Sequence, residues 1–241
     1  MLNVVDRFGV ALLPKKGKRA YFGVSICSRF FSKSNIISMS KWCSESFDQF
    51  LILIADDPQA FTFMATKQID FDSALLKARQ IGHERFNSIS QWLQSSRISN
   101  ASLLSWRDIA SNRQFLRTLN YVNICFTENT LFREDVFSQI QSRNSALPDD
   151  MEFARIRKHY FNTAAQYVIN EIAVMSFLQE FSRSPWPIQI FPLPMPPVLK
   201  GLYEKKYCTD VALNPSRSGY IRIEIEHGVR SGNNTLAQQG T

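Results

Sequence analysis

The chain has 241 residues, of which 44% are hydrophobic and 20% charged, so it can bury a full core and is not disordered throughout. Its formal net charge of +7 is compatible with nucleic acid or an anionic surface, but basicity alone identifies no partner. The four cysteines and three histidines lack zinc-ligand spacing, which argues against a metal site. No segment is long and apolar enough to span a membrane, so we expect a cytoplasmic protein without a membrane partner. The lack of an obvious apolar stripe favours a monomer.

The first part of the chain predicts strands that alternate with helices. Residues 1–18 have the composition of a flexible basic leader, and residues 20–27 (AYFGVSIC) have that of a buried strand. Residues 34–47 follow helical spacing, and residues 50–55 (FLILIA) are wholly apolar. A wholly apolar strand is typical of a parallel sheet that helices cover on both faces.

The rest of the chain continues this alternation. Periodicity predicts helices over 72–97, 105–120, 134–143 and 149–181, and strands over 121–126, 188–191 and 220–226. The helix over 149–181 is the longest, and residues 192–197 read as a rigid proline connector. Alternating apolar and polar side chains make 220–226 an expected edge strand, and residues 228–241 predict a disordered tail.

These elements predict one α/β domain over residues 19–227. Strands alternating with helices indicate a Rossmann-like, three-layer α/β/α sandwich with a mainly parallel sheet. Ligands in such folds bind beyond the carboxyl ends of the strands. We therefore expect the site just after the strands at 20–27 and 50–55.

Several common catalytic motifs are missing from the sequence. There is no GxGxxG and no GxxxxGK[ST], which leaves a dinucleotide or P-loop site without support. The segment GVSIC around Ser25 has the first glycine of a GxSxG elbow but not the second, and no well-placed Asp and His follow it. The tripeptides at 81–83 and 39–41 are similar to ATP-binding signatures of class I aminoacyl-tRNA synthetases, but they are fragments in the wrong order. We therefore expect no ATP.

Three segments, in this order, together resemble the cyclodipeptide synthases. The segment GVS ends the first strand at Ser25, the basic helix KARQIGHERFNSI follows at 77–89, and Tyr167 and Glu171 match the Tyr-xxx-Glu of the family. The resemblance covers the chain from about residue 19 to residue 200. It implies a fold like the catalytic domain of class I aminoacyl-tRNA synthetases, and synthesis of a cyclic dipeptide from two aminoacyl-tRNAs in a ping-pong reaction.

The residues themselves suit such a reaction. Ser25 follows Gly23 at a strand end, where a small hydroxyl allows close approach of a substrate. An aminoacyl ester is already an activated acyl donor, so neither ATP nor a metal is needed to help the weak serine nucleophile. Tyr167 and Glu171 are four apart and share a helix face, where a phenol and a carboxylate can together hold an ammonium group. The resemblance implies that Ser25 carries the acyl group and that Tyr167 and Glu171 handle the amino group.

The resemblance also implies how the two parts of an aminoacyl-tRNA are held. The residues expected to line the amino-acid pocket are Tyr21, Gly23, Ser28, Val174 and Phe191. The residues expected to contact tRNA phosphates are Lys77, Arg79 and Arg85.

Two positions place the chain within the family pattern. One branch has Asn three residues after the catalytic serine and a Tyr-His pair on the late strand. This chain has Ser28 and Phe191-Pro192, which resembles the branch with a variable first position and a Tyr-Pro pair. Phe replaces the tyrosine of that pair, so we expect Phe191 to be a pocket residue without a catalytic role.

Two other functions remain open at this point. A non-catalytic tRNA-binding domain related to class I synthetases needs the basic helix but not Ser25, Tyr167 or Glu171. A serine esterase or acyltransferase needs Ser25 and a base but no basic helix. The missing triad argues against the esterase, and the joint presence of Ser25, Tyr167 and Glu171 argues against the binding domain.

Overall fold

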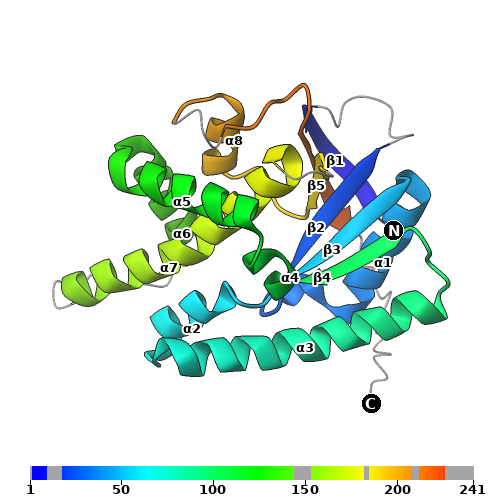
Figure 1. Cartoon of the computed structure of the whole chain (residues 1–241), viewed down its shortest axis with the longest axis horizontal. Coiled ribbons are helices and arrows are strands. Elements are labelled where there is room, and N and C mark those ends of the chain that lie inside the picture. Colours follow the sequence, from blue (N-terminus) through cyan, green and yellow to red (C-terminus); the bar gives the residue numbers. More distant parts are fainter. Residues whose placement is uncertain (1, 10–17, 144–152, 182–184, 208–211, 226–241) are drawn as a thin grey trace, which may run out of the picture.

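The computed structural model describes residues 2–9, 18–143, 153–181, 185–207 and 212–225. In these residues a six-stranded sheet has the order β1-β6-β5-β2-β3-β4, with helices on both of its faces (Figure 1). The strands are β1 (Leu2–Gly9), β2 (Arg19–Ser25), β3 (Gln49–Ala55), β4 (Ala101–Ser105), β5 (Ile188–Phe191) and β6 (Gly219–Ile225). All neighbouring strands are parallel except β1 and β6, which confirms the predicted α/β fold with a mainly parallel sheet.

The first strand corrects two expectations. Leu2–Gly9 does not belong to a flexible leader, because it pairs antiparallel with β6 along its length. As a result β6 is an interior strand, and the prediction of an edge strand over 220–226 was wrong. An exposed edge leaves backbone N–H and C=O groups without sheet partners, and β1 supplies these partners. The remainder of the expected basic leader, at 10–17, and the tail at 228–241 lie outside the described residues.

The helices predicted over 34–47, 72–97, 134–143 and 149–181 correspond to α1, α3, α6 and α7, whereas α2 and α8 were not predicted and the region between β4 and α6 differs. The helical segments are a 3₁₀ turn (Arg29–Phe31), α1 (Lys33–Ser46), α2 (Gln59–Lys67), α3 (Phe71–Ser95), α4 (Trp106–Ala110), α5 (Arg113–Glu128), α6 (Thr130–Arg143), α7 (Phe153–Ser176) with a π-helical turn (Phe177–Phe181), and α8 (Pro197–Tyr203). The strand expected over 121–126 was wrong, because Phe115, Thr118, Val122 and Cys125 continue one buried helical face through that segment. Of the helices in the described ranges, none has both the length and the apolar character that crossing a membrane requires.

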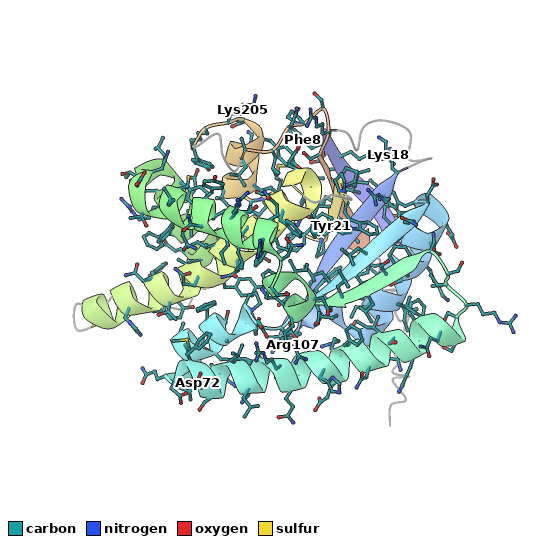
Figure 2. All side chains as sticks on the ribbon, in the orientation of Figure 1. Phe8, Lys18, Tyr21, Asp72, Arg107 and Lys205 are labelled. Atoms are coloured by element: carbon teal, nitrogen blue, oxygen red, sulfur yellow. The ribbon has the colours of Figure 1, made fainter. Side chains whose placement is uncertain are left out.

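The two faces of the sheet bury separate apolar clusters. On one face, Phe22, Ile52 and Ile54 pack with residues of α1, α2 and α3. On the other face, Tyr21 and Leu53 pack with residues of α4 to α8. Figure 2 shows Tyr21 in the interior, between the sheet and the second group of helices. The alternation of side chains along a strand produces this division, since neighbouring residues point to opposite faces.

Helix α3 is attached closely to the carboxyl end of β3. A Cβ added to Gly82 would lie 2.4 Å from the Cβ of Asp56, so only glycine allows this approach. The Arg79 guanidinium donates two hydrogen bonds of 2.8 Å to the Asp57 carboxylate. Asp56 is buried and accepts a hydrogen bond of 3.2 Å from the Trp106 backbone N–H. Burial, with a contribution from neighbouring Asp57, raises the pKa of Asp56 above its usual range.

Candidate functional site

A cavity of about 460 Å³ opens at the carboxyl ends of β2 and β3 and is roofed by α7. The catalytic and pocket residues expected from the sequence lie in different elements, and the cavity brings all eight of them together. They are Tyr21, Gly23, Ser25, Ser28, Tyr167, Glu171, Val174 and Phe191. The site therefore lies where the fold class predicts it, beyond the ends of two adjacent parallel strands.

Ser25 is the last residue of β2 and faces the cavity. Tyr21, Gly23 and Ser25 are two residues apart, so all three point to the α7 side of the sheet. The chain turns sharply after Ser25, with a backbone hydrogen bond of 3.4 Å from Ser28 N–H to the Ser25 carbonyl oxygen. This turn leaves the Ser25 hydroxyl at the cavity wall, partly accessible, rather than in the sheet.

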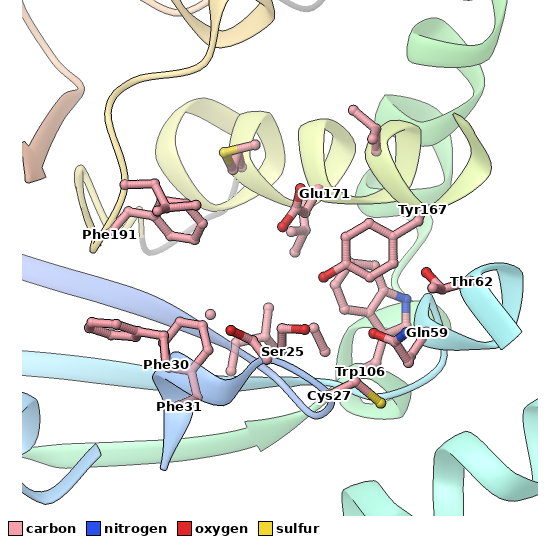
Figure 3. Close-up of a pocket in the computed structure, with 18 of the residues that line it drawn as sticks. Ser25, Cys27, Phe30, Phe31, Gln59, Thr62, Trp106, Tyr167, Glu171 and Phe191 are labelled. Atoms are coloured by element: carbon pink, nitrogen blue, oxygen red, sulfur yellow. The ribbon is translucent and has the colours of Figure 1, made fainter. Parts of the chain in front are cut away.

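Tyr167 and Glu171 enter the cavity from the opposite side. They lie one turn apart on α7, and Figure 3 shows both side chains reaching from this helix toward Ser25. Tyr167 is only 8% exposed, and Glu171 is half-buried. The geometry thus brings a hydroxyl, a phenol and a carboxylate around one space. The roles of the three side chains stay predictions.

A network of buried polar groups fixes the closed end of the cavity. Gln179, on the π-helical turn after α7, donates a hydrogen bond of 3.0 Å to the Tyr21 phenol oxygen. Tyr203, on α8, donates another of 3.0 Å to the Gln179 Oε1 atom. Burial raises the pKa of Tyr21 far above its usual value, so the phenol stays neutral at physiological pH. Tyr21 is consequently a rigid, uncharged part of the cavity floor.

Two arginines of the basic helix, which is α3, have partners within the protein that the sequence did not predict. Arg79 is paired with Asp57, and Arg85 donates hydrogen bonds of 2.7 and 3.4 Å to the backbone carbonyls of Phe31 and Ile26. Arg85 therefore holds the loop that follows Ser25, and both arginines have partners inside the protein. Lys77 is exposed. Contact of these three residues with tRNA stays a prediction.

A second lysine near Lys77 was missed by the sequence reasoning. Lys67, at the end of α2, lies beside Lys77, which lowers the pKa of Lys67. Lys67, Arg85 and Lys77 all act electrostatically on the Cys27 thiol, which lines the cavity, although burial dominates and raises the pKa of Cys27. Three cationic groups thus lie near Cys27 on the cavity wall, and only the fold reveals that they are close to one another.

Other cavity residues were also missed. The missed residues that Figure 3 labels are Cys27, Phe30, Phe31, Gln59, Thr62 and Trp106. Gln59 and Thr62 lie just after β3, so they could have been found from the rule that ligands bind beyond the carboxyl ends of parallel strands. Trp106 follows β4, a strand that the sequence reasoning did not identify. Within the described ranges no group of three or more His, Cys, Asp or Glu side chains could hold a metal ion.

Comparison with known proteins identifies the family. The cyclodipeptide synthase family matches residues 10–211 of this chain. No curated protein matches it. Among solved structures, a cyclodipeptide synthase from Fluoribacter dumoffii is similar, with a TM-score of 0.70, 16% identity, and coverage of 89% of this chain and 93% of the other.

Two further structures are similar in fold. A cyclodipeptide synthase from Candidatus Glomeribacter gigasporarum, bound to Phe-tRNAPhe, has a TM-score of 0.60 and 15% identity, covering 93% of this chain and 95% of that one. The tyrosyl-tRNA synthetase of Archaeoglobus fulgidus has a TM-score of 0.52 and 12% identity, covering 86% of this chain and 55% of the other. At these identities the structures show a shared fold, whereas the family match extends over most of the sequence. On that match, the chain belongs to the cyclodipeptide synthase family of enzymes.

Proposed function

We propose that this protein joins two aminoacyl-tRNAs into a cyclic dipeptide through esters on Ser25. The observation that supports this most is the convergence of Ser25, Tyr167 and Glu171 in one cavity, in a chain that matches the family over residues 10–211. The Phe-tRNAPhe bound to the relative from Candidatus Glomeribacter gigasporarum supports an aminoacyl-tRNA as the substrate.

The first half-reaction transfers an aminoacyl group to the enzyme. The Ser25 oxygen attacks the ester carbonyl carbon, the bond from that carbon to the ribose oxygen breaks, and the proton of Ser25 ends on the released tRNA hydroxyl. The position of Ser25 at the end of β2, beside a chain turn and with its hydroxyl at the cavity wall, supports this role. No ATP or metal takes part in these steps, because the substrate ester is already activated.

The second half-reaction makes two amide bonds in sequence. The amine of the aminoacyl-enzyme attacks the ester of the second aminoacyl-tRNA, which releases the second tRNA and leaves a dipeptidyl ester on Ser25. The free amine of this dipeptide then attacks the Ser25 ester, closes the six-membered ring and returns the hydroxyl. Tethering both reacting groups in one cavity favours the ring closure.

Glu171 and Tyr167 act on the amino group in this scheme. An ammonium group above Ser25 lies within the space that these two side chains share, where the carboxylate accepts a charge-assisted hydrogen bond and the phenol orients the nitrogen. The amine must lose a proton before it attacks, and Glu171 is the one charged side chain among the described cavity residues. We assign the proton relay to Glu171 and the orientation to Tyr167.

The tRNA chain leaves the cavity over its basic mouth. Lys67 and Lys77 bring two adjacent ammonium groups there, and their mutual repulsion decreases when a phosphate lies between them. Arg79 and Arg85 contribute to the positive potential while they hold α3 and the loop after Ser25 in place. Phosphate contacts of this kind weaken as the salt concentration rises.

Expression of the chain in a bacterium, with mass spectrometry of the culture medium, tests the proposal. We expect a 2,5-diketopiperazine with the parent and none with Ser25→Ala. Ser102→Ala is the matched control, because Ser102 is exposed on β4 and is not a cavity residue. Glu171→Gln should reduce the yield by about 100-fold or more, in the range expected for removal of a proton-transfer group.

The proposal fails if Ser25→Ala still yields the product at the parent level. It also fails if neither culture contains a diketopiperazine although the purified protein retains charged tRNA. The second result would favour a tRNA-binding domain without catalytic activity.

A further inference from the structure

We propose that the outer face of helix α5 docks antiparallel against the same face of a second copy of this chain. Helix α5 spans Arg113–Glu128 and lies at the periphery of the molecule, with one side against α6 and α7 (Figure 1). The proposal goes beyond the cyclisation reaction, because the residues that it uses do not line the catalytic cavity.

The outer face of α5 exposes large apolar side chains. Phe115, Val122 and other residues on the inner side of the helix are buried, whereas Leu116 and Ile124 on the outer side are 48% and 42% exposed. Tyr121 beside them is also exposed. Exposed apolar residues normally lie singly on a monomer, so three of them on one helix indicate an interaction site.

The same face is hollowed into a shallow groove of about 500 Å³. Its lining combines apolar and polar side chains, which are Arg113, Leu116, Arg117, Asn120 and Tyr121. Residues three and four apart share one side of a helix, so these residues and Ile124 form a continuous stripe that faces away from the core. The stripe is therefore accessible to a partner along the length of α5.

The charges at the two ends of α5 indicate what the partner is. Arg113 is the first residue of the helix and Glu128 the last, and neither side chain has a hydrogen-bond or ion-pair partner within the described ranges. A helix dipole is positive at the N-terminus and negative at the C-terminus, so each charge lies at the end that disfavours it. An antiparallel second copy reverses both effects, because Arg113 then lies beside Glu128 and the C-terminus of the other helix.

Twofold symmetry about the midpoint of α5, which falls between Asn120 and Tyr121, sets the register of the pair. Leu116 of one copy then lies at nearly the same level as Ile124 of the other. The Asn120 amide likewise comes level with the Tyr121 phenol, which gives the polar centre of the stripe a polar neighbour. One patch therefore supplies apolar, polar and charged partners to its own copy.

An RNA backbone would fit this face less well. Its phosphates would meet Arg113 and Arg117 at one end, but Leu116 and Ile124 in the middle and the Glu128 carboxylate at the other end. The helix, about 24 Å long and about 10 Å wide, offers on the order of 240 Å², well below the roughly 800 Å² that each partner of a stable interface buries. We therefore expect a weak dimer that dissociates on dilution and at high salt.

Sedimentation velocity of the purified full chain at low salt, over a range of protein concentrations, tests the proposal. Arg113→Glu and Glu128→Arg should each raise the dimer dissociation constant by about tenfold or more, because each places like charges at both contacts. An equal mixture of the two variants should associate as the parent does, since both contacts then join opposite charges. Both variants keep a positive net charge, so attraction between their net charges would not explain this recovery.

Ile124→Lys should also weaken the dimer by about tenfold or more, because it places a charge in the apolar part of the stripe. Leu76→Lys is the matched control, since Leu76 is 72% exposed but lies on α3, and it should leave association unchanged. The diketopiperazine yield should stay at the parent level in the α5 variants, so a parent without product would contradict the proposed function and not this inference.

A parent that sediments as a monomer at every concentration would overturn the proposal. So would a parent dimer that none of the three α5 variants weakens, or a mixture of the two charge variants that stays monomeric. If Arg113→Glu instead lowered the affinity for tRNA while the parent stayed monomeric, the face would be an RNA-binding surface.

Discussion

The two faces of β2 differ in what they contact. Phe22 and Val24 are fully buried against the helices of one layer, with no exposed surface. Tyr21, Gly23 and Ser25 line a cavity of about 460 Å³ on the other face. One strand of seven residues thus supports the core on one side and the site on the other. Substitutions at neighbouring residues of β2 should therefore affect different properties, stability on one face and catalysis on the other.

The largest stability effect should come from Phe22. Phe22→Ala removes a fully buried ring that stacks on Phe50 at 6.4 Å between ring centroids. The free energy of unfolding should fall by about 3–5 kcal/mol, as is typical of buried phenylalanine truncations. Urea unfolding followed by circular dichroism measures this change. Phe71→Ala, at a ring that is 41% exposed, should cost much less.

If the comparison between the faces holds, the folded fraction of Phe22→Ala should still make the same product as the parent. A changed product at unchanged stability would show that the two faces of the strand are not independent.

The same substitution at two glycines should act with opposite signs. Gly82→Ala forces a Cβ to within 2.4 Å of the Asp56 Cβ, so we expect a loss of about 1–3 kcal/mol from overpacking. Gly23→Ala adds a methyl group to the open cavity and should leave stability unchanged or raise it by about 0.4–1 kcal/mol. Parallel urea titrations of both variants measure the difference.

Gln80→Ala provides the exposed control on α3 for the Gly82 variant. An equal loss of stability in Gly82→Ala and Gly23→Ala would contradict the distinction between a packed face and an open one.

The smallest effect should appear as a pH dependence at Asp56. Asp56 ionises near 3.8 in an unfolded chain, and burial raises its pKa in the folded protein. Between these two values the folded state holds a proton that the unfolded state has lost, so stability falls as pH rises through this window. Asp56→Asn keeps an oxygen for the Trp106 N–H and removes this titration.

The free energy of unfolding of the Asn variant, relative to that of the parent, should therefore increase from pH 4 to pH 7. Urea unfolding of both proteins at the two pH values measures it. A constant difference between them at both pH values would mean that the Asp56 pKa is not raised by folding.

Sequence periodicity predicted several of the elements that form the site. It failed for segments whose secondary structure depends on contacts with distant parts of the chain. The strands β2 and β3 and the helix α3 have apolar patterns long enough to identify them. The strand β1 gave no such signal, because its pairing with β6 joins the two ends of the described chain. The predicted strand at 121–126 failed because a helical face runs through it.

The site was predictable to a similar extent. The spacing of Tyr21, Gly23 and Ser25 along one strand places them on one face, and the resemblance to the cyclodipeptide synthases supplied Tyr167 and Glu171. Trp106 could not be found this way, because no periodicity identified the strand β4 that precedes it. The sequence likewise could not reveal which charges lie opposite a basic residue.

Arg85 illustrates how this affects the interpretation of mutational data. Its guanidinium connects the middle of α3 to the carbonyl of Ile26, within the turn that follows Ser25, and to the carbonyl of Phe31 beyond that turn. An alanine scan scored by product yield would register Arg85 as essential and, given its helix, would count it among the tRNA contacts. A displaced active-site loop would contribute to the loss, so a map of the tRNA footprint drawn from activity alone would not separate tRNA contact from support of the loop.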